Sequence, residues 1–314
     1  MKKILFISNG HIGDAVLTSG ILNYFLAQNP TAQLTVVSAP IVSHLFEDIP
    51  QLEAIISIKK MPYRRHWLKI YQATRKQHWS IVINMRNSGL SYLLTADKRY
   101  DFIRKLPFSG NHVVAEKQQQ FQLRDFPWPA IKINQSRVDG LSQKLTCYDQ
   151  IIAISPFTRW KNKSWPFEYF LDLIDRLTSS KGPFPDAKIA IFGGQSDRQY
   201  LSYFTDKLKD RVIDLVDNGH LLDKAVWIQH CQLYIGNDAG GSHMAAALNC
   251  PTVTLFGPTD ARRYHPKGQY ARFVQTDIPY QSLINQPNEH AMSSLSVDKV
   301  YQTIQDLLFQ SIKN

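Results

Sequence analysis

The 314-residue sequence contains little cysteine and no long apolar run. Its three cysteines are odd in number and far apart, so the sequence indicates neither a disulfide framework nor a zinc site. No apolar stretch approaches the roughly 18 residues that a membrane-spanning helix needs. The apolar run Ile4–Ile7, which follows two lysines, is too short for a signal peptide and is typical of a buried first strand. These absences predict a cytoplasmic protein.

Acidic side chains are missing from one long stretch, because none stands between Glu53 and Asp97. The sequence has a net charge of +10, and its basic residues concentrate in this stretch: Lys59, Lys60, Arg64, Arg65, Lys69, Arg75, Lys76 and Arg86. Aromatic residues from Tyr63 to Trp79 alternate with them. Such a segment suits an anionic bilayer surface or a phosphorylated glycolipid, or it forms a solvated basic helix face. No RNA- or DNA-binding motif accompanies it, so we expect no nucleic-acid partner.

Short apolar segments alternate with helical periodicity, a pattern typical of parallel sheets with crossover helices. Strands are expected at Lys3–Ser8, Gln33–Ser38, Ala54–Ile58, Ile81–Met85, Ile151–Ile154, Lys188–Phe192, Val212–Leu215, Gln232–Gly236 and Thr252–Phe256. Helices are expected at Phe167–Thr178, Asp197–Leu208 and Leu222–His230. The alternation stops between Lys117 and Gln150, and the final segment Val297–Phe309 has the periodicity of an amphipathic helix. We therefore predict an α/β protein with two Rossmann-like, doubly wound parallel-sheet domains, residues 1–149 and 150–294, and a final helix within 295–314.

The stretch Asn237–Asp260 is the most informative part of the sequence. It predicts a strand, a turn of small residues at Asp238–Gly241, a short helix and a second strand. Small residues at such a turn leave the first helical amides bare, and bare amides at a helix N-terminus bind anions such as phosphate. His243, in the first helical turn, would reach the same anion. The alternative is a βαβ unit whose glycines only let the helix pack tightly, with His243 at the surface.

Three segments together resemble one known family. The run from Asp238 to Thr259 is similar to the C-terminal donor-site motif of the heptosyltransferases, glycosyltransferase family nine. Ser8–Leu17 resembles the N-terminal strand, Gly-Asp pair and following helix of that family. Ser155–Pro166 is similar to its central Thr-Arg and Lys-x-Trp-Pro element. The three segments span most of the chain in the same order as in the family.

The resemblance implies the GT-B fold, in which two Rossmann-like domains face each other across a cleft, and a last helix that packs back on the N-terminal domain. It implies an inverting glycosyltransferase that moves heptose from ADP-heptose onto a lipopolysaccharide core or lipid A-linked acceptor, in peripheral contact with the anionic inner membrane surface. Three alternatives remain open: another nucleotide-sugar donor, a sugar-nucleotide epimerase, or a non-catalytic anion-binding module.

The resemblance also places two catalytic residues. Asp14, which follows Gly13 after the first strand, matches the family's catalytic aspartate, which takes the proton from the acceptor hydroxyl. On local sequence alone, Asp14 suits a helix N-cap as well. Lys163 is the candidate that neutralises the leaving diphosphate with a compact positive charge. The alternative for Lys163 is an exposed loop charge.

The remaining candidates bind the two substrates. Donor-binding residues are expected to be Thr158, Gly194, Gln195, Asp238, Ala239, Gly240, Gly241 and His243. Thr158 would offer its hydroxyl to the diphosphate, and Gln195 stands where several family members carry an acid that contacts the ribose. The sequence has no Asp-x-Asp motif, so Lys163 and the amides of the turn would replace a metal ion. We expect neither a metal nor a cofactor.

Acceptor binding is expected in the N-terminal domain, through Gly13, Arg64 and Arg86. The segment Asn84–Ser88 resembles a family segment that faces the acceptor, with Asn84 in place of the usual acid. Arginine side chains suit the carboxylates and phosphates of the lipopolysaccharide inner core, because a guanidinium binds such groups through two parallel hydrogen bonds.

Overall fold

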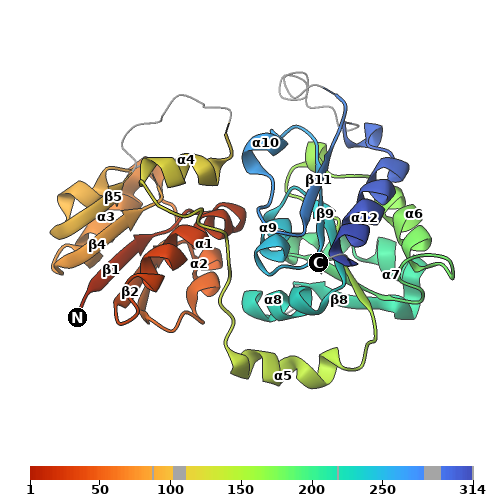
Figure 1. Ribbon diagram of the computed structural model, residues 1–314, viewed down its shortest axis with the longest axis horizontal. Helices are drawn as coiled ribbons and strands as arrows, with labels where there is room; N and C mark the ends of the chain where they lie inside the picture. Colours follow the sequence, from red (N-terminus) through yellow and green to blue (C-terminus); the bar gives the residue numbers. More distant parts are fainter. Residues whose placement is uncertain (87, 102–110, 218, 279–290, 313–314) are drawn as a thin grey trace. The chain divides into compact units, whose positions relative to one another are not determined.

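The computed structural model describes residues 1–86, 88–101, 111–217, 219–278 and 291–312 (Figure 1). The chain divides into two compact units, Met1–Asn134 and Gln135–Asn314. Each unit is built on a parallel β-sheet with helices packed against it, as predicted. None of the described helices combines the length and the apolar character that crossing a membrane requires.

The first unit contains a five-stranded sheet of order β3-β2-β1-β4-β5. Its strands are β1 Lys3–Ile7, β2 Gln33–Ser38, β3 Leu52–Ser57, β4 Trp79–Asn84 and β5 Ala96–Asp101. The chain runs outward from β1 to β3 and then returns to pair β4 with the other side of β1. This reversal makes the carboxyl ends of β1 and β4 a topological switch point, where sheets of this type bind ligands.

Helices connect these strands. They are α1 Ile12–Ala27, α2 Pro40–Ser43, α3 Arg65–Thr74 and α4 Val113–Gln120, with short 3₁₀ helices η1 His44–Phe46, η2 Pro62–Arg64 and η3 Leu90–Leu93. Strand β5 was not predicted. Its sequence, ADKRYD, is largely polar because β5 lies at the edge of the sheet and several of its side chains are exposed. An edge strand therefore lacks the apolar signature of a buried one.

The second unit contains a six-stranded sheet of order β11-β10-β9-β6-β7-β8. Its strands are β6 Ile151–Ser155, β7 Lys188–Gly193, β8 Val212–Val216, β9 Leu233–Asn237, β10 Thr252–Phe256 and β11 Ala271–Gln275. The strand order reverses between β6 and β9, so the carboxyl ends of these two strands form the second switch point. Strand β11, another partly exposed edge strand, was not predicted.

The helices of the second unit include the predicted α6 Phe167–Thr178 with the expected bounds. The others are α5 Gln135–Leu145, α7 Ser202–Leu208, α8 Leu221–His230, α9 Gly240–Ala247, α10 Ala261–Tyr264 and α12 Val297–Ile312, with 3₁₀ helices η4 Lys161–Lys163, η5 Gln195–Tyr200, η6 Lys209–Arg211 and η7 Ala291–Ser294. The predicted helix over Asp197–Leu208 is instead η5 followed by α7.

One expectation about domain organisation differs from the structure. The first unit ends at Asn134 and not at residue 149, because α5 packs against α8 and Arg137 forms an ion pair with Asp223 on that helix at 2.6 Å. The final helix α12 belongs to the second unit. Its apolar stripe of Val300, Ile304 and Leu307 is buried in the core of the second unit, against α6 and β11.

Candidate functional site

Asp14 lies at the switch point of the first unit, in the first turn of α1. The N-cap of α1 is His11, three residues earlier, so the interpretation of Asp14 as the N-cap is wrong. The Asp14 backbone is held in place, because its carbonyl accepts hydrogen bonds from Asn9 Nδ2 at 3.3 Å and Thr18 Oγ1 at 2.9 Å. Its side chain is exposed, and within the described residues the carboxylate has no hydrogen bond or ion pair. The carboxylate is therefore available to a ligand.

Arg86 follows β4 at the same switch point. Its Nε donates to the Ser8 carbonyl at the end of β1, at 2.6 Å, and its backbone amide donates to Asn84 Oδ1 at 3.0 Å. Burial lowers the pKa of Arg86 from its ordinary value. No carboxylate pairs with Arg86 among the residues that the structure describes, so the outer nitrogens of the guanidinium can bind an anionic ligand.

An acid that sequence reasoning missed contacts Asn84. Asn84 Nδ2 donates to Asp101 Oδ2 at 3.0 Å, and Asn84 pairs with Asp101 in the register between β4 and β5. Asp101 therefore places a carboxylate beside Asn84 at the carboxyl ends of β4 and β5. Asp101 was missed because β5 was not predicted. Asn87, within the segment expected to face the acceptor, lies outside the described residues.

The basic segment forms an outward-facing surface on η2 and α3. Helix α3 buries His66, Ile70 and Thr74, which leaves its cations on the opposite face. Arg64 is exposed in a left-handed backbone conformation, with its guanidinium 5.0 Å from the centroid of the Trp67 ring. The structure therefore confirms an exposed cationic face. No described contact joins Arg64 to Arg86.

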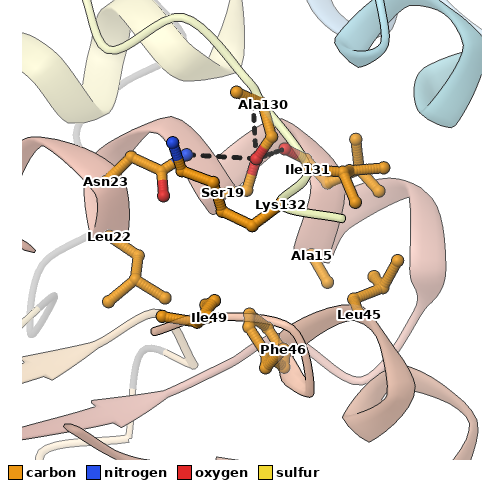
Figure 2. A pocket seen from close by; sticks show the side chains of 11 residues that line it. Ala15, Ser19, Leu22, Asn23, Leu45, Phe46, Ile49, Ala130, Ile131 and Lys132 are labelled. Atoms are coloured by element: carbon orange, nitrogen blue, oxygen red, sulfur yellow. Dashed lines mark hydrogen bonds between the residues drawn. The ribbon is translucent and has the colours of Figure 1, made fainter. Parts of the chain in front are cut away.

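The first unit also contains a small pocket that is separate from these residues (Figure 2). Its lining is mainly apolar and comes from α1, from η1 and the following Ile49, and from the segment 130–132. The Ala130 backbone donates to Ser19 Oγ at 3.0 Å, and its carbonyl accepts from Asn23 Nδ2 at 3.1 Å. The pocket contains none of the predicted site residues. We interpret it as a packing gap between α1 and the segment 130–132, which is close to the end of the first unit.

In the second unit, the structure brings together two predicted site residues that lie 75 positions apart. Lys163 Nζ donates to Asp238 Oδ2 at 2.6 Å, and the two side chains are 19% and 8% exposed. Asp238 directly precedes Ala239, the N-cap of α9. The Lys163 ammonium is thus held at the N-terminus of a helix, and two of its three protons remain for a ligand. Lys163 is not the exposed loop charge of the alternative interpretation.

The N-terminal turn of α9 has the predicted anion-binding character. Ala239 is extended, no side chain caps the helix, and the first amides of a helix have no intrahelical acceptor. Gly241 is required here, because a Cβ atom at this position would collide with the Tyr234 hydroxyl. Burial raises the pKa of Tyr234, so the phenol stays protonated at neutral pH. His243 is buried at 7% exposure, so the alternative that places it at the surface is wrong.

A buried asparagine at the end of β9 links the two loops of this site. Asn237 Nδ2 donates to the Pro156 carbonyl at 2.7 Å, and its Oδ1 accepts from the Trp165 amide at 3.1 Å. A Cβ atom at Gly257 would lie 3.3 Å from the Asn162 carbonyl, so the loop carrying Lys163 also packs closely on the end of β10. Sequence reasoning missed Asn237, since its partners are distant in the chain.

Thr158 forms hydrogen bonds within its own loop. Its hydroxyl donates to the Trp160 carbonyl at 2.7 Å and accepts from the Trp160 amide at 3.0 Å. The single proton of the hydroxyl is therefore used within its own loop. In this structure Thr158 shapes the loop before Lys163 and offers no donor to a diphosphate.

The end of β7 carries the remaining donor-site candidates. Gly194 and Gln195 are exposed, and the Gly194 amide donates to Asp197 Oδ2 at 2.8 Å. Lys224, from α8, donates to the Gly193 carbonyl at 2.9 Å, and burial lowers its pKa. Strand β6 separates β7 from β9 in the sheet. Gly194 and Gln195 therefore share the sheet edge with Lys163 and Asp238 but do not contact them in the described contacts.

These observations give each unit a distinct chemical character. The first unit presents an exposed carboxylate, that of Asp14, and an arginine, Arg86, that has no acid partner among the described residues. The second presents an ammonium and helix amides, which together stabilise negative charge on phosphate oxygens. A proton acceptor and a diphosphate site are the parts that a sugar transfer from a nucleotide needs.

Comparison with known proteins agrees with this chemistry. Residues 100–292 match the family model described as glycosyltransferase family 9 (heptosyltransferase). Lipooligosaccharide heptosyltransferase 2 of Campylobacter jejuni is 23% identical over 96% of both chains. Two solved structures match: a family 9 glycosyl transferase from Veillonella parvula (TM-score 0.79, 20% identity, 98% and 97% coverage) and the Escherichia coli ADP-heptose lps heptosyltransferase II (0.74, 19%, 99% of each chain). Likeness at this level of identity shows the GT-B fold.

Proposed function

The chain belongs to glycosyltransferase family 9, the heptosyltransferases, and we propose that it transfers heptose from ADP-heptose to a lipopolysaccharide core acceptor with inversion. Family membership makes the chain a glycosyltransferase and removes the epimerase and the non-catalytic module from the alternatives. The names of the similar proteins support the choice of heptose, ADP and lipopolysaccharide. The observation that carries the proposal is the Lys163–Asp238 pair at the N-terminus of α9.

The second unit binds the donor in this proposal. The Lys163 ammonium and the amides of Gly240 and Gly241 neutralise the charge that develops on the leaving diphosphate. Such donors, held in place before the reaction, are worth most where charge appears only in the transition state. Asp238 orients the ammonium toward the helix. Gln195, on the same sheet edge, offers an amide to the ribose hydroxyls.

The first unit binds the acceptor. Asp14 takes the proton from the attacking hydroxyl, and its exposed carboxylate at the switch point suits this role. Gly13 lets the acceptor approach the backbone beside Asp14. Arg86, whose outer nitrogens have no acid partner within the described parts of the chain, pairs with a carboxylate or phosphate of the acceptor.

We further infer that the enzyme is cytoplasmic and meets its lipid-linked acceptor at the anionic inner membrane surface. The outward face of η2 and α3 supports this, because it places Arg64 and Arg65 beside two exposed apolar side chains, Tyr63 at 96% and Leu68 at 59%. Cations are attracted to anionic headgroups, and amphipathic or apolar side chains enter the interface.

A nucleotide screen by thermal unfolding tests the proposed donor. We expect ADP to raise the melting temperature more than UDP, GDP or CMP at equal concentration. A ligand at about 100 times its dissociation constant stabilises the fold by roughly 2.7 kcal/mol. The variant Lys163→Ala serves as the control and should lose most of the shift. If UDP or GDP stabilised the protein more strongly than ADP, the donor would be another nucleotide sugar.

Acceptor kinetics at varied salt test the first unit. The variants Arg64→Gln/Arg65→Gln and Arg86→Gln should each raise the Michaelis constant for the acceptor and leave that for the donor unchanged. The effect of substituting the exposed Arg64 and Arg65 should vanish at high salt, because exposed charges are screened over about 8 Å at physiological ionic strength. The effect of the half-buried Arg86 should persist.

Three exposed lysines of the second unit provide the matched control for net charge: Lys144, Lys181 and Lys207. Changing all three to glutamine should leave the acceptor constant unchanged. If the Michaelis constant for the acceptor changed neither with salt nor with the arginine substitutions, the basic segment would be a solvated surface without a role in acceptor binding.

A further inference from the structure

Trp160 is an exposed indole on a backbone that is tightly held. Its side chain is 62% exposed. Its carbonyl accepts hydrogen bonds from Thr158 Oγ1 at 2.7 Å and from the Lys163 amide at 2.9 Å, and its own amide donates to Thr158 Oγ1 at 3.0 Å. Single exposed aromatic residues are common on protein surfaces, so exposure alone indicates nothing. The position of this indole carries the argument.

The indole stands beside the ammonium that we assign to the diphosphate. Lys163 Nζ lies 5.4 Å from the centroid of the Trp160 ring and 2.6 Å from Asp238 Oδ2. Within the described residues, the Lys163 ammonium therefore lies close to both the indole of Trp160 and the carboxylate of Asp238, the residue that directly precedes the N-cap of α9. A diphosphate bound to Lys163 brings the group attached to it next to the exposed ring.

We infer that Trp160 is a platform for the ring of the transferred sugar, an inference that rests on the proposed function. The transferred sugar is bonded directly to the diphosphate, whereas the nucleobase is separated from it by the ribose. The C–H bonds on one face of a pyranose carry partial positive charge, which the negative face of an aromatic ring attracts. Trp160 thereby favours the complete donor over the free nucleotide.

Thr158 is then a positioning residue that acts through Trp160. Its hydroxyl closes the turn at both the amide and the carbonyl of Trp160, which limits the directions that the indole can take. A binding group held in one conformation before the ligand arrives loses less entropy on binding. This role replaces the direct phosphate contact that the sequence predicted for Thr158.

Calorimetric titration of Trp160→Ala with ADP and with ADP-heptose tests the inference. We expect the dissociation constant for ADP-heptose to rise roughly tenfold, the size of an aromatic contact. That for ADP should stay within about twofold, because ADP lacks the transferred sugar. Trp160→Phe should retain most of the affinity. Trp128→Ala removes an indole of similar exposure, 57%, from the first unit and should change neither constant.

The outcomes separate the inference from the proposed function. Equal weakening of ADP and ADP-heptose would place the indole against the nucleoside and overturn the inference, as would no change in either. Wild-type protein that bound neither ligand would instead refute the proposed donor. Unchanged melting temperatures verify that each variant is folded.

Thr158→Val gives an independent readout of the positioning role. It should weaken ADP-heptose binding but not ADP binding, and it should add nothing in a Trp160→Ala background, because the two residues act as a unit. Thr158→Ser keeps the hydroxyl and should restore affinity. A loss of ADP affinity in Thr158→Val would show that the hydroxyl contacts phosphate and would overturn this role.

Discussion

Replacing Asp14 with asparagine is expected to lower turnover by at least about 100-fold and to leave the dissociation constant for ADP unchanged. The amide has the shape of the carboxylate but cannot take a proton from the acceptor hydroxyl. The structure makes this a clean substitution, because the carboxylate is exposed and has no hydrogen bond or ion pair within the described residues. Initial rates with ADP-heptose, together with ADP titration, provide the measurement.

Folding should be little affected by the same change. The loss of a negative charge near a helix N-terminus typically costs about 0.3–1 kcal/mol at an exposed site. Glu53→Gln removes another exposed acid of the first unit and should leave turnover unchanged. Near-normal turnover in Asp14→Asn would remove Asp14 from the mechanism, and its role would then be limited to favouring the N-terminus of α1.

Replacing Lys163 with alanine should lower turnover by about 10²- to 10³-fold, the usual cost of losing one stabilising donor at a developing negative charge. Affinity for ADP should fall as well. Wild-type activity should be unaffected by EDTA, because in our proposal Lys163 and the α9 amides stand in place of a metal ion. Lys161→Ala, two residues away and exposed, is the matched control and should keep its activity.

The ion pair complicates this experiment in a way that can be controlled. Asp238 is only 8% exposed, so removing Lys163 leaves a nearly buried charge without its partner and lowers stability. The double variant Lys163→Met/Asp238→Asn removes both charges and should recover the melting temperature but not the turnover. Activity that EDTA abolished and Mg²⁺ or Mn²⁺ restored would contradict the metal-independent mechanism.

Both predictions concern residues that could be identified from the sequence, whereas the residues that hold the site together could not. Asp14 and Lys163 were found through the family resemblance, and the structure rejects the alternatives of an N-cap and an exposed loop charge. The residues that form hydrogen bonds around these sites were not predicted. Asn237, Asp101 and Lys224 each act through a contact with a residue at least 17 positions away. The hydrogen bonds between Thr158 and Trp160 were likewise not foreseen.

Features that depend on near neighbours in the chain could be predicted from the sequence. Buried strands such as β1, β2 and β10 appear as apolar runs, α6 appears as an apolar stripe, and the Gly-rich turn before α9 appears as small residues, because each is a local periodicity or a local steric demand. These features were enough to predict the α/β class and two parallel sheets.

The tertiary structure decided what depends on strand order and register. Edge strands β5 and β11 are partly exposed, so their polar sequences carry no strand signal. The pairing of β4 with β5 places Asp101 opposite Asn84. The loops after β6 and β9 bring Lys163 into contact with Asp238. Helix α12 packs into the core of the second unit. Contacts of this kind are selected by packing across the whole unit, and no local pattern in the chain encodes them.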